Sequence, residues 1–292
     1  MNILKGGTVV VIGGAGTGAG LGRGLVRHFA AKGMRVAILD REGDAAAALA
    51  TELRAEGIDA ISCVVDVANH ESLRAAAETV GGTFNACNVL CAHVGTGGQG
   101  RFEQTPISVW RQAYEVMVIG VVASVQAFLP LMRSTSGFRR IVLTSSVAAL
   151  APGRFQGPYR AAKAAVTSIG ETLDLEFGPQ GIGATVIFPS GMADESLIGG
   201  SLAEENARAQ AARRRREDPV WAAIGEELNR DPTDLIAGQH AAKPVVDAVI
   251  AGQRYVITHG RTVAGYSAER QRLLDQAFED LARREYLPGD PP

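Results

Sequence analysis

The sequence predicts a doubly wound α/β fold, in which a parallel sheet is covered by helices on both faces. Short, β-branched, continuously apolar runs alternate with longer helical patterns through the first two thirds of the chain. Continuous apolar strands separated by helices are typical of parallel strands that are buried on both faces. Right-handed crossovers between such strands place ligands at their carboxyl ends.

Each element is predicted from the local pattern in chain order. The strands are short apolar runs: Thr8–Ile12, Arg35–Leu39, Ala60–Val65, Val89–Ala92, Ile141–Thr144, Ala184–Phe188 and Tyr255–Thr258. The helices are longer periodic segments: Leu21–Lys32, Asp44–Glu56, His70–Val80, Ile107–Arg133, Pro158–Phe177, Lys243–Ala251 and Ala268–Arg284.

The alternation of strands and helices breaks between residues 190 and 240, where helical patterns continue without a strand. We found no interdomain linker and no repeat, so residues 1–292 are interpreted as one domain and 190–240 as a helical insertion. Because the insertion follows a strand end, we expect it to cover the substrate. Its apolar residues either line a substrate pocket or pack on the sheet: Met192, Leu197, Ile198, Leu202, Trp221 and Ile224.

Composition gives no sign of unusual partners or surroundings. Hydrophobic residues make up 46% and charged residues 21% of 292, with a formal net charge of −2. These values are ordinary for a globular enzyme and give no reason to expect nucleic acid or an anionic membrane as partner. We expect no signal peptide and no segment apolar and long enough to span a bilayer. The three cysteines form no CxxC pair, so free thiols, no metal site and a cytoplasmic location are expected.

A glycine-rich loop follows the first strand, from Gly13 to Gly24, and leads into a helix. Glycines between a strand and a helix allow the backbone to approach a pyrophosphate, which rests at the positive helix end. Gly20, Leu21 and Gly22 begin the helix, and either Gly14 or Gly16 is the first motif glycine. The pattern predicts a dinucleotide site on a Rossmann-type fold.

Acidic residues follow the second and third strands. Asp40 ends the second strand, where a carboxylate can accept hydrogen bonds from ribose hydroxyls and repel a 2′-phosphate. NAD is therefore expected over NADP, although Arg41 offers a phosphate partner. Asp66 and Val67 close the third strand, where an adenine ring would lie; alternatively Asp66 is a helix N-cap.

A tyrosine and a lysine are four residues apart in Tyr159-Arg160-Ala161-Ala162-Lys163, downstream of Ser146 at the end of the fifth strand. This spacing puts both side chains on one helix face. A free phenol has a pKa near 10, and a neighbouring ammonium favours its phenolate. The pair therefore predicts proton transfer next to a bound dinucleotide.

With these motifs the sequence resembles the short-chain dehydrogenase/reductase family across nearly the whole chain. The resemblance implies that Tyr159 is the general acid/base, that Ser146 binds the substrate oxygen, and that Lys163 lowers the tyrosine pKa and holds the nicotinamide ribose. Two turns should contact the cofactor: His93-Val94-Gly95 and Pro189-Ser190-Gly191-Met192. Family members assemble as dimers or tetramers through two long helices, which correspond here to Ile107–Arg133 and Pro158–Phe177.

Two positions depart from the family pattern. Its Asn-Asn-Ala-Gly turn reads Ala92-His93-Val94-Gly95, and its helix asparagine aligns with Met117. That asparagine holds a water that leads protons from the lysine to solvent, whereas a thioether donates no hydrogen bond. Either another group such as His93 completes the relay, or turnover is slow. A single histidine that replaces a structural amide is more often a structural hydrogen-bonding residue, which is the favoured interpretation of His93.

The predicted function is hydride transfer between NAD(H) and an alcohol or ketone carbon of a small, apolar or aromatic substrate. The alternative is a nucleotide-binding regulator or scaffold with weak or no turnover, which Met117 and the missing amides suggest. A non-redox lyase or isomerase on the same fold is a third reading.

Overall fold

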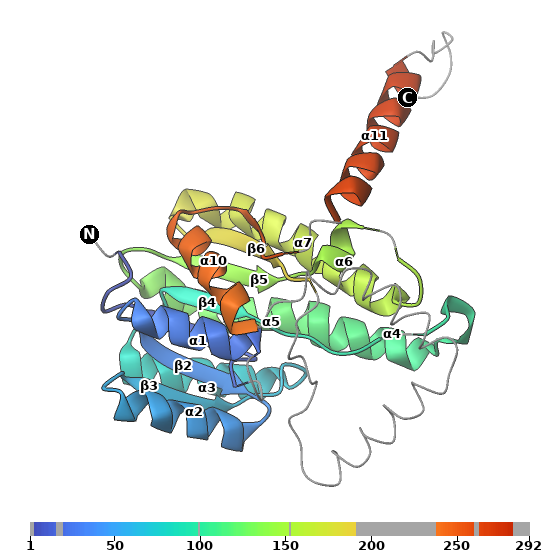
Figure 1. Ribbon diagram of the computed structural model, residues 1–292. Helices are drawn as coiled ribbons and strands as arrows, with labels where there is room; N and C mark the ends of the chain where they lie inside the picture. Colours follow the sequence, from blue (N-terminus) through green and yellow to red (C-terminus); the bar gives the residue numbers. More distant parts are fainter. Residues whose placement is uncertain are drawn as a thin grey trace.

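The computed structural model describes residues 3–15, 20–98, 100–151, 153–190, 238–259 and 263–282. Its described strands form one parallel sheet in the order β3-β2-β1-β4-β5-β6-β7 (Figure 1). The order reverses between β1 and β4, which makes a topological switch point at their carboxyl ends. The predicted doubly wound sheet is confirmed. The strands are β1 (Thr8–Ile12), β2 (Arg35–Asp40), β3 (Ala60–Val64), β4 (Val89–Ala92), β5 (Arg140–Thr144), β6 (Gly183–Phe188) and β7 (Tyr255–Ile257).

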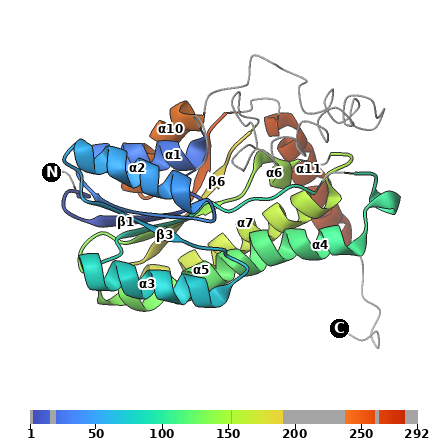
Figure 2. The same cartoon turned by 90° about the horizontal axis from the view of Figure 1, so that it is seen from below.

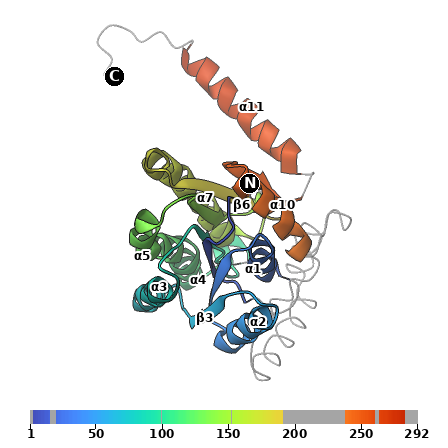
Figure 3. The same cartoon turned by 90° about the vertical axis from the view of Figure 1, so that its left-hand side faces the viewer.

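Helices cover both faces of this sheet (Figure 2). One face carries α1 (Leu21–Ala31), α2 (Gly43–Ala55) and α10 (Gly238–Ile250). The other carries α3 (His70–Phe84), α4 (Ile107–Tyr114), α5 (Gly120–Ser134) and α7 (Gly157–Phe177). Shorter elements are η1 (Phe102–Gln104), α6 (Val147–Leu150) and η3 (Gly178–Gln180). The last described helix, α11 (Val263–Ala282), extends away from the sheet (Figure 3).

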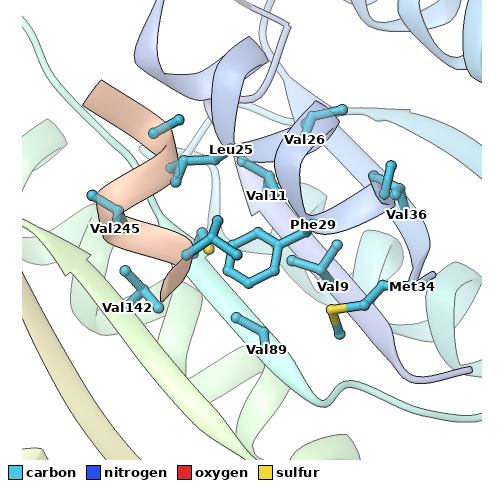
Figure 4. Packing of buried hydrophobic residues seen from close by; sticks show 14 of the residues in the cluster. Val9, Val11, Leu25, Val26, Phe29, Met34, Val36, Val89, Val142 and Val245 are labelled. Carbon is cyan, nitrogen blue, oxygen red and sulfur yellow. The ribbon is translucent and has the colours of Figure 1, made fainter. Parts of the chain in front are cut away.

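Two apolar layers hold the sheet between its helices. Alternate residues of a strand point to opposite faces, so Val9 and Val11 of β1 pack in one layer and Val10 and Ile12 in the other. Phe29 of α1 lies fully buried at the centre of the first layer (Figure 4). These layers fix the strand ends from which the site is built.

The predicted strands agree with the observed ones to within one residue at each end. The predicted helix Ile107–Arg133 is interrupted by a π-helical turn, η2 (Glu115–Ile119), between α4 and α5. Periodicity did not predict this turn, because one extra residue in a helical turn leaves the apolar pattern on either side intact. The short helix α6 was missed because four residues carry no periodic signal.

One expectation about membranes is corrected. The helical segment Ile107–Ser134, which includes the π-helical turn, is long and apolar enough to cross a membrane by length and composition alone, and the mean hydropathy of its most apolar 18-residue window is 1.9. In its most apolar window 44% is buried, and apolar faces of α5 pack into the layer below the sheet. Helices that pack in the core of a protein also meet this criterion of length and composition, and α5 packs in this way.

The insertion predicted at 190–240 lies outside the described residues, apart from Ser190 and the first turn of α10. The single-domain assignment and the substrate-covering role of this segment therefore stay predictions.

Candidate active site

The glycine turn after β1 brings the strand end against two neighbouring segments. Gly13 has a φ of +76°, a region that favours glycine, and a Cβ there would lie 2.0 Å from the carbonyl oxygen of His93. A Cβ on Gly22 would lie 2.0 Å from the carbonyl oxygen of Gly13. Only glycines permit this approach of β1, β4 and α1, so the turn is a close backbone cradle.

The start of α1 is open toward this cradle. Gly20 caps the helix without any side-chain hydrogen bond, and a Cβ on it would meet no atom of the described residues within 4 Å. The first N–H groups of a helix have no partner in the helix, and they attract anions. Leu21 is buried, and Gly14 packs against Val11. These residues fit a dinucleotide pyrophosphate; Gly16 lies outside the described residues.

The carboxylate of Asp40 lies next to the glycine turn and accepts hydrogen bonds from its backbone and from the residues after β2. Its Oδ2 accepts from the backbone N–H of Ala15 at 2.9 Å, and its Oδ1 accepts from that of Glu42 at 3.1 Å. A carboxylate oxygen has two lone pairs, so acceptor capacity remains for ribose hydroxyls. Arg41 is exposed and forms an ion pair with Glu42 at 3.5 Å.

The predicted adenine-side residues have local structural roles. Asp66 Oδ1 accepts from the N–H of Ala68 at 3.0 Å in a turn after β3. The N-cap reading of Asp66 is wrong, because Asn69 caps α3 by accepting from Glu71 N at 3.1 Å. Val67 is buried against Gly120.

His93 extends β4 and connects it to β5. Its N–H donates to the carbonyl of Ile12 at 3.0 Å, and its Nδ1 lies 3.1 Å from Thr144 Oγ1. Burial, with the charge of Lys163 as a smaller cause, lowers the pKa of His93 to about 4. The imidazole is therefore neutral near pH 7.

Lys163 is the centre of the site. Its side chain is 2% exposed, and Nζ donates to the carbonyl oxygens of Val94 at 2.9 Å and Thr144 at 2.8 Å. Nζ lies 5.8 Å from the ring centroid of Tyr159, one helical turn earlier on α7. Ser145 Oγ donates to the backbone carbonyl of Lys163 at 2.8 Å and thereby fastens α7 to β5.

Ser146 lies at the same strand end. Its Oγ accepts from Ala148 N at 3.1 Å as the N-cap of α6, and it donates to the carbonyl of Pro189 at 3.3 Å. The carbonyl of Pro189 also accepts from Val147 N at 3.0 Å, so the end of β6 joins the site. Gly191 and Met192 lie outside the described residues.

Met117 is fully buried in the π-helical turn, among Ala113, Ala162 and Tyr159. Tyr159 packs against this cluster, to which the thioether of Met117 contributes no hydrogen-bond donor. π-helical turns are frequent at functional sites.

The structure thus brings Ser146, Tyr159, Lys163, His93, Val94 and Pro189 to the carboxyl ends of β4, β5 and β6. Asp40, Gly13 and Gly22 lie around the adjoining ends of β1 and β2, whereas Gly95 is exposed. Sequence reasoning did not predict that Thr144 contacts His93 or that Ser145 and Thr144 contact Lys163. The signal that could have indicated these contacts is the run of hydroxyl residues at the end of β5. Among the described residues no cluster of His, Cys, Asp and Glu can hold a metal ion.

Comparisons with known proteins agree with this architecture. The family model described as short chain dehydrogenase matches residues 8–219. The uncharacterised short-chain type dehydrogenase/reductase y4mP of Sinorhizobium fredii is 34% identical over 205 residues, which cover 70% of this chain and 80% of that protein. The 2,5-dichloro-2,5-cyclohexadiene-1,4-diol dehydrogenase LinX of Sphingobium indicum is 31% identical over 65% of this chain and 75% of its own. The probable oxidoreductase EphD of Mycobacterium bovis is 33% identical over 63% of this chain, but over only 31% of its own length.

Solved structures share the fold. A short chain dehydrogenase/reductase from Burkholderia phymatum, in complex with NAD, has a TM-score of 0.77 at 24% identity and covers 100% of both chains. The apo form of LigD from Sphingobium sp. strain SYK-6 has a TM-score of 0.74 at 21% identity, over 93% of this chain and 97% of its own. At these identities the likeness concerns the fold.

Proposed function

The chain belongs to the short-chain dehydrogenase/reductase family, and from this premise we propose that it transfers a hydride between NAD(H) and an alcohol or ketone carbon. Members of this family are oxidoreductases that use a nicotinamide cofactor and act on small molecules. The choice of NAD, the role of Tyr159 and the kind of substrate belong to the proposal.

The observation that carries the proposal is the buried ammonium of Lys163, one helical turn after Tyr159. Its three protons are strong donors, and two of them are directed at backbone carbonyls. A cation held within 6 Å of a phenol ring favours the phenolate. No other described lysine is buried, so this placement supports a chemical role.

In the oxidation direction, the Tyr159 phenolate takes the hydroxyl proton of the alcohol while the C–H bond electrons leave as hydride. A bound nicotinamide supplies the hydride acceptor, or the donor in the reverse direction. Ser146 Oγ, already hydrogen-bonding at the end of β5, orients the substrate oxygen. In the reduction direction, Tyr159 returns the proton to the carbonyl oxygen.

The residues present fit NAD better than NADP. The close backbone turn at Gly13 and the open start of α1 suit a pyrophosphate. Asp40, a negative charge at the end of β2, favours ribose hydroxyls over a 2′-phosphate. The fold neighbour from Burkholderia phymatum, solved with NAD, is consistent with this choice.

Tyr159→Phe tests the proposal. The variant should retain the native circular dichroism spectrum and bind NADH, yet lose roughly 10²- to 10⁴-fold in NAD-linked oxidation of secondary or benzylic alcohols. Tyr255→Phe, which removes an exposed hydroxyl that donates to Glu171, is the matched control and should retain activity. Near-native turnover by Tyr159→Phe would overturn the assignment.

A second candidate function, a nucleotide-binding regulator with weak or no turnover, is favoured by the buried Met117. Tight NADH binding without absorbance change at 340 nm, across alcohols and ketones with both cofactors, would select it. Robust turnover of any substrate would remove it.

We also propose a homodimer or homotetramer in the cytoplasm. Exposed apolar side chains on the two long helices support the oligomer, among them Ile107, Ile119 and Leu175. Light scattering measures the mass of the native protein and of the Leu175→Arg variant. The native protein should be a dimer or tetramer and the variant a smaller species, whereas a native monomer would contradict the assembly. Fractionation of cells tests the location.

A further inference from the structure

Two loops meet beside the first turn of α7, which carries Tyr159. The loop after β4 approaches α7 so closely that a Cβ on Gly98 would lie 3.5 Å from the backbone nitrogen of Tyr159. The N–H of Gly100 then donates to the carbonyl of Phe155 at 2.8 Å and ties this loop to the one before α7. Both loops follow carboxyl ends of strands, which is where substrates bind in this kind of sheet.

Arg160 of α7 forms hydrogen bonds to the backbone of the segment that precedes α7. Its Nη1 donates to the carbonyls of Ala148 at 3.1 Å and Ala151 at 2.6 Å. Gly153 makes room for this side chain, because a Cβ there would overlap the guanidinium. The loop is therefore held in one shape by the residue that directly follows Tyr159.

Phe155 is strained within this held loop. Its φ is +62°, and in the described chain only Asn85 is another non-glycine residue with positive φ. A bulky aromatic residue rarely adopts this conformation, and such strain persists where the surroundings impose it, often at functional sites. Here the hydrogen bond from the N–H of Gly100 to the carbonyl of Phe155 helps to hold the backbone in this conformation.

Two arginines, one from each loop, lie over that ring. Arg101 Cζ is 5.8 Å and Arg154 Cζ is 5.6 Å from the ring centroid of Phe155, and both side chains are exposed. The aromatic face attracts each guanidinium and restricts its motion. The two guanidinium groups place positive charge beside the first turn of α7, and positive charge attracts an anion.

We propose that Arg101, Arg154 and Phe155 form a subsite for a carboxylate carried by the substrate, with Phe155 packing on the adjoining carbon skeleton. This inference rests on the proposed function, in which the other end of the same molecule reacts at Tyr159. A guanidinium matches a carboxylate with two parallel hydrogen bonds, and restricting it beforehand lowers the cost of ordering it. The substrate class is then an oxo or hydroxy acid whose carboxylate is remote from the reacting carbon.

Binding and turnover together test the subsite. The probes are three keto acids of different reach, 5-oxohexanoate, 3-acetylbenzoate and 4-acetylbenzoate, each paired with its methyl ester. Binding to NADH-saturated protein is measured by calorimetry, and reduction is followed at 340 nm. The variants are Arg101→Gln, Arg154→Gln and Arg154→Lys. Arg74→Gln, an exposed arginine on α3, is the control.

At least one keto acid should bind about tenfold more tightly than its ester. That preference should vanish in both Gln variants, recover only in part in Arg154→Lys, and remain in Arg74→Gln. The subsite is wrong if no acid exceeds its ester, or if the Gln variants retain the native preference. Acid-selective binding without turnover would support the subsite and contradict the proposed oxidoreductase. Equal turnover of acids and esters would support the oxidoreductase and contradict the subsite.

Discussion

The ammonium nitrogen of Lys163 lies 2.8 Å from the carbonyl oxygen of Thr144, the last residue of β5. A second carbonyl, that of Val94 after β4, lies at 2.9 Å. The hydroxyl of Thr144 is in turn 3.1 Å from the imidazole of His93. Two neighbouring strand ends therefore fix the cation through backbone dipoles, and no asparagine is needed for its position.

Lys163→Met should preserve the bulk of the side chain but remove the cation that favours the Tyr159 phenolate. We expect kcat for alcohol oxidation to fall at least ~10²-fold. The rising limb of activity against pH should move to higher pH, because the phenol then ionises later. Initial rates from pH 6 to 11 check this; an unmoved limb would show that Lys163 acts only in binding.

Met117→Asn places an amide beside Tyr159, where the family has one. If a closed water path limits native turnover, kcat should rise several-fold and the solvent isotope effect should shrink. The amide enters an apolar cluster, so the free energy of unfolding should fall by about 1–3 kcal/mol.

Met117→Leu is the control for that experiment. It conserves volume, should cost less than about 1.5 kcal/mol, and should leave the isotope effect unchanged. A Met117→Asn variant no faster than the leucine variant would mean that protons leave by another route.

His93 makes stability depend on pH. The folded protein keeps its imidazole neutral down to a pKa of about 4, whereas in the unfolded chain it takes a proton near pH 6.5. Between these values the unfolded state binds more protons, so the free energy of unfolding falls as the pH falls, by up to about 3 kcal/mol. His93→Asn should remove this contribution.

Urea unfolding at pH 7 and pH 4.5, followed by circular dichroism, measures the contribution of His93 to the free energy of unfolding. The loss of stability on acidification should be about 2 kcal/mol smaller in His93→Asn than in the native protein. Equal losses would mean that the imidazole is protonated in the folded state.

The strands and most helices were predictable because each is specified by its own residues. The apolar run of β1, for example, ends at Ile12 in both prediction and structure. The site depends on pairs that are distant in sequence: His93 meets Thr144 51 residues later, and Lys163 meets Val94 69 residues earlier. No local pattern reports such pairs. The helical spacing of four placed Lys163 near Tyr159, but it said nothing of the carbonyl oxygens to which Lys163 donates.

Asp40 shows how a correctly chosen residue can carry a second role. The sequence predicted a ribose-binding carboxylate, and the structure adds hydrogen bonds to Ala15 and Glu42 that fasten the glycine cradle. Substitution at this position should therefore change both cofactor choice and the order of the cradle.

Asp40→Asn and Asp40→Ala separate the two roles. The amide oxygen of Asn can still accept one backbone N–H but carries no charge, so the variant should lose much of its preference for NAD while the loop persists. Alanine accepts neither N–H, so binding of NAD and NADP should both weaken, by about tenfold or more, because two donors lose their partner. Fluorescence titration with NADH and NADPH measures both affinities. If Asp40→Asn kept the native ratio of the two, charge at Asp40 would not set cofactor choice, and Arg41 or residues outside the described part of the chain would have to do so.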